Sequence, residues 1–532
     1  MKHSHHLSII FFLVFLLAFR CQFVDGGASQ VKFLPGFEGP LPIHLETGYI
    51  GVGEEEKVQL FYFFVKSNSN PEKDPIVLWL IGGPGCSSLS SLLFEIGPLL
   101  IDRENDESLP TLSMHPHAFT EAANIIYLDL PVGTGYSYAR TPEALRSTGL
   151  QSCEHAHQFV QKWLIDHPEF ASNPFYVGGN SYVGITVPVI VDFISNGNEA
   201  TIDPRVNLKG YVLGNPGTTF PADGDYRIPF AHGMGLIPDE LYESLKENCN
   251  GSYINVDSNN LACLKDVQKF HQLVDVLFEE QILETTCDPR PRPSMEIDER
   301  TLDSSNNHQQ FARNWCYSLM QTCKANYTGK DSFECSRNFR TLHQLVEDFL
   351  KQVFESSCQK LRMKGDSASN GHQELDEIRQ LPPMKSCYNY RLNFIDHWAS
   401  DPHVQEALHV RKGTVEEFIR CNHSIPHTDI LWDSTPYHAN LSAKGYRSLI
   451  YSGDHDMVVP FISTQAWIRS LNYSIVDEWR PWFVEGVVAG YTRSYANNMT
   501  FATVKGGSHT PGSSHPKECA AMFKRWMSYK PL

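Results

Sequence analysis

Positive charge is scarce in this sequence of 532 residues, which holds 44 lysines and arginines against 61 aspartates and glutamates. The formal net charge is therefore −17 at pH 7. Nucleic acids and anionic membrane surfaces attract proteins through clustered basic residues, so this balance argues against both as partners. The charge does not identify a substrate.

Motifs for metals and cofactors are also missing. The zinc-binding pattern H-E-x-x-H does not occur. A G-x-G pair follows an apolar run at Gly133 and Gly135, but the third glycine of a dinucleotide-binding turn would fall at Tyr138. The sequence therefore predicts neither a metal nor a cofactor.

Long hydrophobic runs are limited to residues 7–19, which follow Lys2 and several histidines. The run is short for a bilayer span, and small residues follow it at 26–28. This pattern is typical of a secretory signal peptide over residues 1–26, with a retained membrane anchor as the alternative. We therefore expect a protein of the secretory pathway, in the vacuole or outside the cell, with no membrane span after signal cleavage.

The sequence contains thirteen cysteines. An oxidising secretory compartment would allow them to pair. Six asparagines stand in N-x-S/T sequons, which makes them candidate glycosylation sites. These are Asn250, Asn326, Asn422, Asn440, Asn472 and Asn498.

Short apolar runs bounded by turn residues predict β-strands in both halves of the chain. The runs lie at 61–65, 76–80, 124–130, 175–177, 208–213, 446–451 and 499–504. Helical spacing of apolar residues occurs between them, at 151–166, after 185, at 404–410 and at 518–529. Strands that alternate with helices predict an α/β fold with a mostly parallel sheet.

A predicted strand, a tight turn and a predicted helix meet at Gly179-Asn180-Ser181-Tyr182. This arrangement is typical of a nucleophile elbow, in which a sharp turn exposes a serine hydroxyl above the sheet. The last position of the G-x-S-x-G pattern is Val183, however, so the turn alone also fits an ordinary serine. The choice between the two depends on the rest of the chain.

The strand rhythm is interrupted over residues 220–392, where cysteines and an internal repeat occur. The text HQLVDVLFEEQILETTC at 271–287 returns as HQLVEDFLKQVFESSC at 343–358, and the cysteine gaps of 14, 24 and 29 return as 12, 23 and 29. We predict a helical module held by two disulfides, present twice, over about 243–316 and 317–387. A tandem exon duplication or the joining of alternative exons would explain it.

Candidates for an acyl-transfer site follow three predicted strands: Ser181, an acid at Asp454 or Asp456, and His509. A serine hydroxyl becomes a nucleophile when an imidazole takes its proton, and a carboxylate orients that imidazole. The order Ser, Asp, His is that of the α/β-hydrolase triad. We therefore predict an α/β-hydrolase core over 27–219 and 393–532, with the disulfide-rich helical region 220–392 as a lid insertion.

Several stretches closely resemble the serine carboxypeptidase family, and within it the plant serine carboxypeptidase-like acyltransferases. They read WLIGGPGCSS, NIIYLDLPVGTGYSY, FYVGGNSYVGI, YVLGNP, SGDHDMVVPFISTQAWIRSLNYS and TVKGGSHT. The resemblance implies that Ser181 is the nucleophile, His509 the base and Asp456 the orienting carboxylate, with Asp454 as the runner-up.

The resemblance also implies which groups face the substrate. The backbone N–H groups of Gly83 and Tyr182 would bind the oxyanion, and Ile81, Gly82 and Asn180 would contact the substrate. In the peptidases of the family, an asparagine and a glutamate at the places of Ile81 and Asn180 bind the substrate's terminal carboxylate. Because Ile81 forms no hydrogen bond, we predict poor carboxypeptidase activity.

The resemblance therefore favours transfer of an acyl group from a 1-O-glucose ester, through Ser181, to an alcohol or amine acceptor. The partners would be a small-molecule donor and acceptor. Two alternatives stay open: a serine carboxypeptidase acting on peptide C-termini, and an inactive secreted binding protein of the same fold.

The family finally implies disulfide pairs. Cys86 would pair with Cys421, and Cys249 with Cys263. Cys287 would pair with either Cys316 or Cys387, because the repeat offers two partners. If both modules fold alike, Cys323–Cys335 and Cys358–Cys387 follow, and Cys153 and Cys519 stay free or pair unexpectedly.

Overall fold

The computed structural model describes residues 28–102, 109–284, 388–428 and 431–532. Contacts divide the chain into two compact units, Met1–Cys287 with Pro382–Leu532, and Asp288–Leu381. The second unit lies outside the described residues. The first unit includes the beginning of the predicted insertion together with the sheet.

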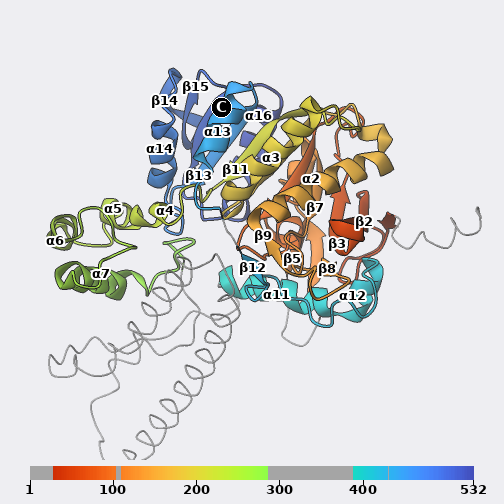
Figure 1. Cartoon of the computed structure of the whole chain (residues 1–532), viewed down its shortest axis with the longest axis horizontal. Coiled ribbons are helices and arrows are strands. Elements are labelled where there is room, and N and C mark those ends of the chain that lie inside the picture. The colour runs from red at the N-terminus through yellow and green to blue at the C-terminus, as the bar shows by residue number, and fades with distance from the viewer. Residues whose placement is uncertain (1–27, 103–108, 285–387, 429–430) are drawn as a thin grey trace, which may run out of the picture. The chain divides into compact units, whose positions relative to one another are not determined.

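A mixed sheet of twelve strands forms the centre of the described part of the chain (Figure 1). In spatial order its strands are β1 (Ser29–Val31), β2 (Leu45–Val52), β3 (Val58–Val65), β7 (Asn124–Leu128), β4 (Ile76–Ile81), β10 (Phe175–Asn180), β11 (Leu208–Gly214), β13 (Arg447–Gly453), β16 (Met499–Val504), β15 (Val487–Tyr495) and β14 (Ile475–Val484), with β8 (Tyr138–Ala139) paired to β3. Strands β7 to β16 of this order run parallel, whereas both edges are antiparallel.

Helices and short elements connect these strands. The α-helices are α2 (Gly149–Asp166), α3 (Val183–Glu199), α4 (Ala222–Asp225), α5 (Arg227–Gly233), α6 (Asp239–Cys249), α7 (Leu261–Val274), α11 (Tyr388–Ser400), α12 (Pro402–Ala407), α13 (Thr435–Ala443), α14 (Phe461–Ser470), α15 (Pro511–Ser514) and α16 (Pro516–Met527). Single turns are η1 (Glu54–Glu56), η2 (Ser91–Glu95), η3 (Phe119–Glu121) and η4 (Pro168–Phe170), and the strand pairs β5 (Leu99–Asp102) with β6 (Thr111–Met114) and β9 (Ser147–Thr148) with β12 (His427–Thr428) complete the set.

Strand β4, near the centre of the sheet, is apolar throughout because both faces of the sheet are covered. Along β4, Val77 and Trp79 enter a core shared with α11 and α16, whereas Leu78 and Leu80 enter a second core shared with α2 and α3. Successive side chains of a strand point to opposite faces, so one buried strand supplies both cores. Figure 1 shows α2 and α3 side by side on one face of the sheet.

The described part of the predicted insertion forms a small core from α5, α6 and α7, which Met457 of the loop after β13 also enters. A disulfide joins Cys249, the last residue of α6, to Cys263 in the first turn of α7. The other pairings predicted for the module and its repeat, including those of Cys287, lie outside the described residues.

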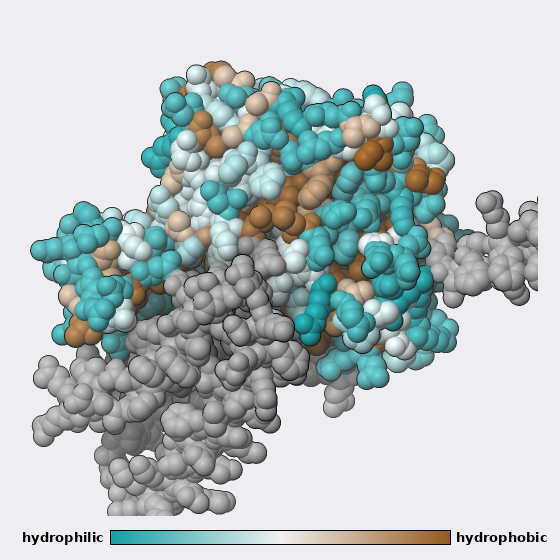
Figure 2. All heavy atoms as spheres, in the orientation of Figure 1, coloured by the Kyte–Doolittle hydropathy of each residue, from teal (hydrophilic) through white to brown (hydrophobic). Residues whose placement is uncertain are grey.

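The surface seen in Figure 2 is mainly hydrophilic. This agrees with the cores described above, which hold the large apolar side chains of the central strands. Among the described helices, none combines the length and hydrophobicity that a membrane span requires.

Candidate active site

Adjacent parallel strands of the sheet end at one edge, where the three predicted catalytic residues lie together with Asn215, which the sequence did not predict. Ser181 follows β10, Asn215 follows β11, Asp456 follows β13 and His509 follows β16. Ligands of open α/β sheets bind at the carboxyl ends of the strands, so this edge is the expected place for a site.

The predicted elbow is present at Ser181, whose φ is 69°. Such a backbone conformation is costly for a residue with a side chain and persists when its surroundings hold it. The Ser181 N–H donates to the Gly214 carbonyl at 3.0 Å, and the Ser181 carbonyl accepts from Gly184 at 2.9 Å and Gly217 at 3.1 Å. These bonds fix the turn at the start of α3.

Val183, which replaces the usual glycine of the elbow pattern, is buried against Gly179. A Cβ atom added at Gly179 would lie 2.5 Å from Cγ2 of Val183, too close for any real side chain. The missing side chain at Gly179 therefore makes room for the larger residue at position 183, and the turn keeps its shape.

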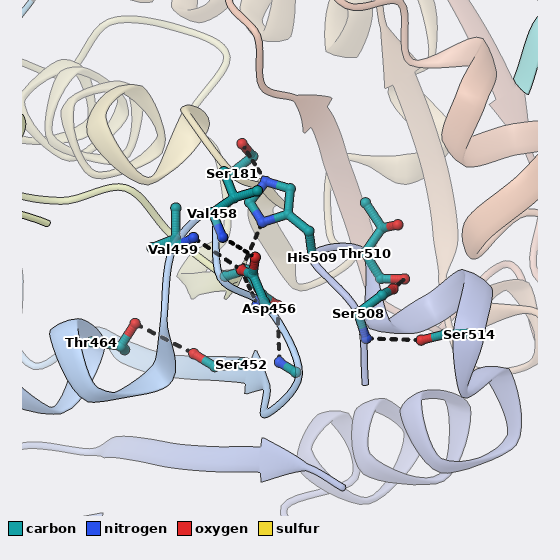
Figure 3. Close-up of polar contacts among 12 residues, drawn as sticks. Ser181, Ser452, Asp456, Val458, Val459, Thr464, Ser508, His509, Thr510 and Ser514 are labelled. Carbon is teal, nitrogen blue, oxygen red and sulfur yellow. Dashed lines mark hydrogen bonds and ion pairs between the residues drawn. The ribbon is translucent and has the colours of Figure 1, made fainter. Parts of the chain in front are cut away.

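The structure brings the three predicted residues together (Figure 3). His509 Nε2 lies 2.8 Å from Ser181 Oγ, and His509 Nδ1 lies 2.7 Å from Asp456 Oδ2. An ionised carboxylate only accepts hydrogen bonds, so Nδ1 must carry the proton that it donates. The Nε2 atom of the neutral imidazole is then free to accept the proton of Ser181.

Asp456 is fully buried and is held by several donors. Its carboxylate accepts from the N–H groups of Val458 at 2.7 Å and Val459 at 3.2 Å (Figure 3). The Asn215 amide donates to Oδ2 at 2.7 Å and accepts from the Gly453 N–H at 3.1 Å. These bonds orient the carboxylate toward the imidazole.

Asp454, the runner-up acid, serves other partners. Its Oδ1 atom accepts from the Gly506 N–H at 2.6 Å and contacts Nδ1 of His455 at 2.8 Å. Between the two acids of the G-D-x-D text, the structure therefore places Asp456, and not Asp454, on the imidazole of His509.

The environment of His509 stabilises its charged form. Burial disfavours the imidazolium, but the Asp456 carboxylate outweighs this effect and raises the pKa of His509 above its ordinary value. The carboxylates of Glu280 and Glu95 act in the same direction. The site is therefore arranged to hold a proton on the imidazole during a reaction.

Space for a developing oxyanion lies beside Ser181 because residue 82 has no side chain. A Cβ atom added at Gly82 would lie 2.9 Å from Ser181 Oγ and 2.6 Å from the Tyr182 nitrogen. Gly83 follows with φ 116°, a conformation that favours glycine. Among the described residues, neither the Gly83 N–H nor the Tyr182 N–H has a hydrogen-bond acceptor. Both are available as donors to a reacting group.

A disulfide joins this glycine-rich loop to a segment that is distant in the sequence. Cys86 is bonded to Cys421, 335 residues away. Backbone bonds flank the bridge, from Ser87 to Arg420 at 2.7 Å and from Asn422 to Gly85 at 2.9 Å. Both predicted disulfides of the described residues are thus present, and Cys153 and Cys519 are buried and free.

The predicted substrate-binding residues Ile81 and Asn180 lie opposite each other in the register of β4 and β10. The Asn180 side chain is buried, and both ends of its amide are used. It donates to Glu95 Oε2 at 3.1 Å and accepts from the Tyr451 hydroxyl at 3.1 Å. The Asn180 side chain, one residue before Ser181, is therefore engaged by groups of the protein itself.

Glu95 is a site residue that the sequence reasoning missed. It is buried and accepts from Ser91 Oγ at 2.9 Å as well as from Asn180. Burial raises its pKa to about 7, against the opposing effect of these hydrogen bonds. The available signal was that Glu95 is the single acid within the mostly apolar residues 92–101. An acid is rarely buried in such a stretch without a partner.

No group of histidine, cysteine, aspartate and glutamate side chains in the described ranges is arranged to hold a metal ion.

Comparisons with known proteins identify the family of this chain. A family model described as serine carboxypeptidase matches residues 35–529. Serine carboxypeptidase-like 11 of Arabidopsis thaliana is 45% identical over 522 residues, which cover 98% of this chain and 99% of that protein. Serine carboxypeptidase-like 17 of the same plant is 45% identical over 532 residues, which cover 100% of this chain and 100% of that protein.

Among solved structures, a similar fold occurs in Kex1(delta)p, a prohormone-processing carboxypeptidase from Saccharomyces cerevisiae. The TM-score is 0.60 at 17% sequence identity, with 94% of this chain and 95% of that chain covered. At this identity the likeness shows the fold alone.

Proposed function

Because the chain belongs to the serine carboxypeptidase family, whose members are hydrolases and acyltransferases, we propose that it is an acyltransferase. In this proposal Ser181 takes an acyl group from a 1-O-glucose ester and passes it to an alcohol or amine acceptor. The catalytic roles of Ser181, His509 and Asp456 are part of the same proposal.

The observation that favours transfer over peptidase activity is the state of Ile81 and Asn180. A carboxypeptidase needs free donors at this place for the terminal carboxylate of its substrate. Ile81 has none, and the Asn180 amide is buried between Glu95 and Tyr451. A site built to bind a polar group discriminates strongly, and its discrimination is lost when the polar partners are absent or occupied.

The proposed first half of the reaction follows from the geometry. His509 Nε2 removes the proton as Ser181 Oγ attacks the ester carbonyl, and Asp456 stabilises the imidazolium that forms. The N–H groups of Gly83 and Tyr182 stabilise the oxyanion. When the intermediate collapses, the bond to the glucose oxygen breaks, and that oxygen takes the proton from His509. The acyl group remains on Ser181.

The second half repeats these steps with the acceptor. His509 removes a proton from the acceptor hydroxyl or amine, which attacks the acyl-Ser181 ester. The product leaves as a new ester or amide, and Ser181 Oγ recovers its proton from His509. Water in place of the acceptor would give hydrolysis.

The test is to offer the purified protein a panel of 1-O-glucose esters with alcohol and amine acceptors. We expect acceptor-dependent formation of new esters or amides, lost in Ser181→Ala. Release of C-terminal amino acids from blocked dipeptides at peptidase-like rates would overturn the preference for transfer.

A fluorophosphonate, which reacts with activated serines, separates both enzyme readings from an inactive binding protein. We expect a covalent adduct on Ser181. A folded sample that forms no adduct would contradict an enzymatic role.

We also propose that the protein works in a secretory compartment, where the Cys86–Cys421 and Cys249–Cys263 bridges would form. Exposed sequon asparagines at Asn250, Asn472 and Asn498 support this. Glycopeptide mass spectrometry of the protein from its native tissue tests the proposal.

A further inference from the structure

A short segment after α7 crosses the two loops that carry Asp456 and His509. We call residues 278–282 the strap. The Glu280 carbonyl accepts the His509 N–H at 2.7 Å, and the Glu279 carbonyl accepts the Met457 N–H at 2.9 Å. The strap is therefore joined by its backbone to the residue that follows Asp456 and to His509 itself.

A side-chain contact adds to these backbone bonds. Gln281 is buried, and its Nε2 atom donates to the Gly506 carbonyl at 2.8 Å. Gly506 lies three residues before His509 in a turn where its φ is 76°. The N–H of the same glycine donates to Asp454 at 2.6 Å. The turn is thus held on one side by Gln281 and on the other by Asp454.

We propose that Gln281 is a positioning residue for His509, through which the cysteine-rich module sets the geometry of the catalytic base. The proposal rests on the role of His509 given above, and it does not depend on the identity of the acyl donor or acceptor. Gly506 has no side chain, so the module contacts this turn through its backbone. The contact is the hydrogen bond from the Gln281 amide to the Gly506 carbonyl. A displacement of about 1 Å at a reacting group can cost about a hundredfold in rate.

The test is the second-order rate constant for labelling of Ser181 by a fluorophosphonate, which needs the base but no natural substrate. Gln281→Leu keeps the volume and removes the amide, and we expect labelling to fall by about tenfold or more. Gln272→Leu, the same change at an exposed position of α7, is the matched control and should label at the unsubstituted rate.

A second readout separates positioning from a general loss of structure. An imidazole that moves away from Asp456 loses the interaction that raises its pKa, so the pH midpoint of labelling should move down in Gln281→Leu. The charged groups acting on His509 are Asp456, Glu280 and Glu95, and this substitution leaves all three in place. With p-nitrophenyl acetate, kcat should fall while KM stays unchanged.

Labelling of folded Gln281→Leu within threefold of the unsubstituted rate, with the same pH midpoint, would overturn the proposal. If that variant does not fold, Gln281→Ala replaces it under the same limits. Absence of labelling in the unsubstituted protein would show that His509 does not activate Ser181, and the proposed role of Gln281 would then be refuted as well. Labelling without transfer from glucose esters would refute the proposed substrates and leave the role of Gln281 standing.

Discussion

At the residue scale, the site depends on a side chain that is absent. Gly82 leaves open the space beside Ser181 Oγ and the Tyr182 nitrogen, where the proposed oxyanion would form. A methyl group in that space would meet the nucleophile and one of its donors at less than 3 Å. The geometry of the site therefore makes a direct prediction about position 82.

We predict that Gly82→Ala lowers the rate of Ser181 labelling by about a hundredfold or more, the usual cost of losing an oxyanion donor. Gly233→Ala is the matched control, because a Cβ atom there meets nothing within 4 Å. Labelling rates of the two folded variants give the result. Equal rates would show that the space beside Ser181 is not used by the reaction.

The proton on His509 leads to a prediction about pH. Its pKa is raised by Asp456, and a base must be neutral to act, so activity should be lost as pH falls through that raised value. We expect the labelling rate to rise with pH, with a midpoint above the ordinary value of 6.5. A midpoint at or below 6.5 would mean that the His509–Asp456 contact is absent in solution.

Residue identity predicted part of this site and could not predict the rest. Ser181 and His509 follow recognisable turns, and their order along the chain indicates the triad. Asp454 and Asp456 stand two residues apart in one loop, so their spacing leaves both open; the family resemblance favoured Asp456, and the structure places it on the imidazole of His509. Asn215 and Gln281 are common polar residues whose roles arise from partners far away in the sequence.

At the element scale, the most predictable features are those with a local signal. The start of α2 carries a capping box, in which Thr148 and Gln151 bond to each other's backbone N–H groups. Its spacing predicted a helix over 151–166, and the structure extends it to Gly149–Asp166. The predicted strands of the parallel sheet also have a local signal, since continuous apolar runs indicate strands that are buried on both faces.

The hairpin of β14 and β15 was not predicted, and its burial pattern explains why. Apolar side chains of β14 such as Ile475, Val476 and Phe483 are exposed, so apolar and polar residues do not alternate. The pairing also shifts register at three places, and Pro481 lies within the strand. A strand at the edge of the sheet with irregular pairing leaves no period in the sequence.

An ion pair connects β2 to the end of α2. His167 Nε2 lies 2.9 Å from Glu46 Oε1, and the Tyr62 hydroxyl donates to the same carboxylate at 2.9 Å. Burial opposes both charges, yet the partners lower the pKa of Glu46 to about 2 and raise that of His167. The pair is therefore charged over a wide range of mildly acidic pH.

The pKa directions fix the pH window of its stabilising effect. The Glu46 contribution is present above its ordinary value of 4.5 and is lost as pH falls toward 2. The His167 contribution is present below its ordinary value of 6.5 and is lost as pH rises through the raised value. Both contributions are complete between pH 4.5 and 6.5.

We predict that Glu46→Gln lowers the free energy of unfolding by about 1–3 kcal/mol in this window, the cost of leaving a buried polar partner unsatisfied. Denaturant unfolding at pH 5.5 and pH 9 measures the effect. Glu55, which is exposed and paired with Lys57, offers a control in Glu55→Gln, which should change stability little. An equal loss for Glu46→Gln at both pH values would contradict the assignment to His167.

At the scale of the whole molecule, the site is assembled from segments that lie far apart in the chain. The glycine-rich loop after β4 and the segment around Cys421 are joined by a disulfide across 335 residues. The order of the strands in the sheet sets the order of the site residues along its edge. The strap adds a contact from the cysteine-rich module. Such long-range arrangements are set by topology, which explains why the sequence predicted the fold class more fully than the contacts.

We predict that replacing both Cys86 and Cys421 by alanine lowers stability by about 2–5 kcal/mol and also slows labelling of Ser181, because the bridge supports the oxyanion loop. Replacing Cys249 and Cys263, which close a loop of 14 residues, should affect stability more than labelling if the strap keeps its contacts. Thermal unfolding and labelling rates measure both. Unchanged labelling in the Cys86 and Cys421 variant would show that the loop holds its shape without the bridge.

The most direct measurement of the central claim is mass spectrometry of the protein after brief mixing with a reactive 1-O-glucose ester. We expect the peptide containing Ser181 to gain the mass of the acyl group and to lose it when an alcohol or amine acceptor is added, with no gain in His509→Ala. An acyl group found on another residue, or a Ser181 peptide that never gains mass while the protein is folded and reacts with a fluorophosphonate, would contradict it.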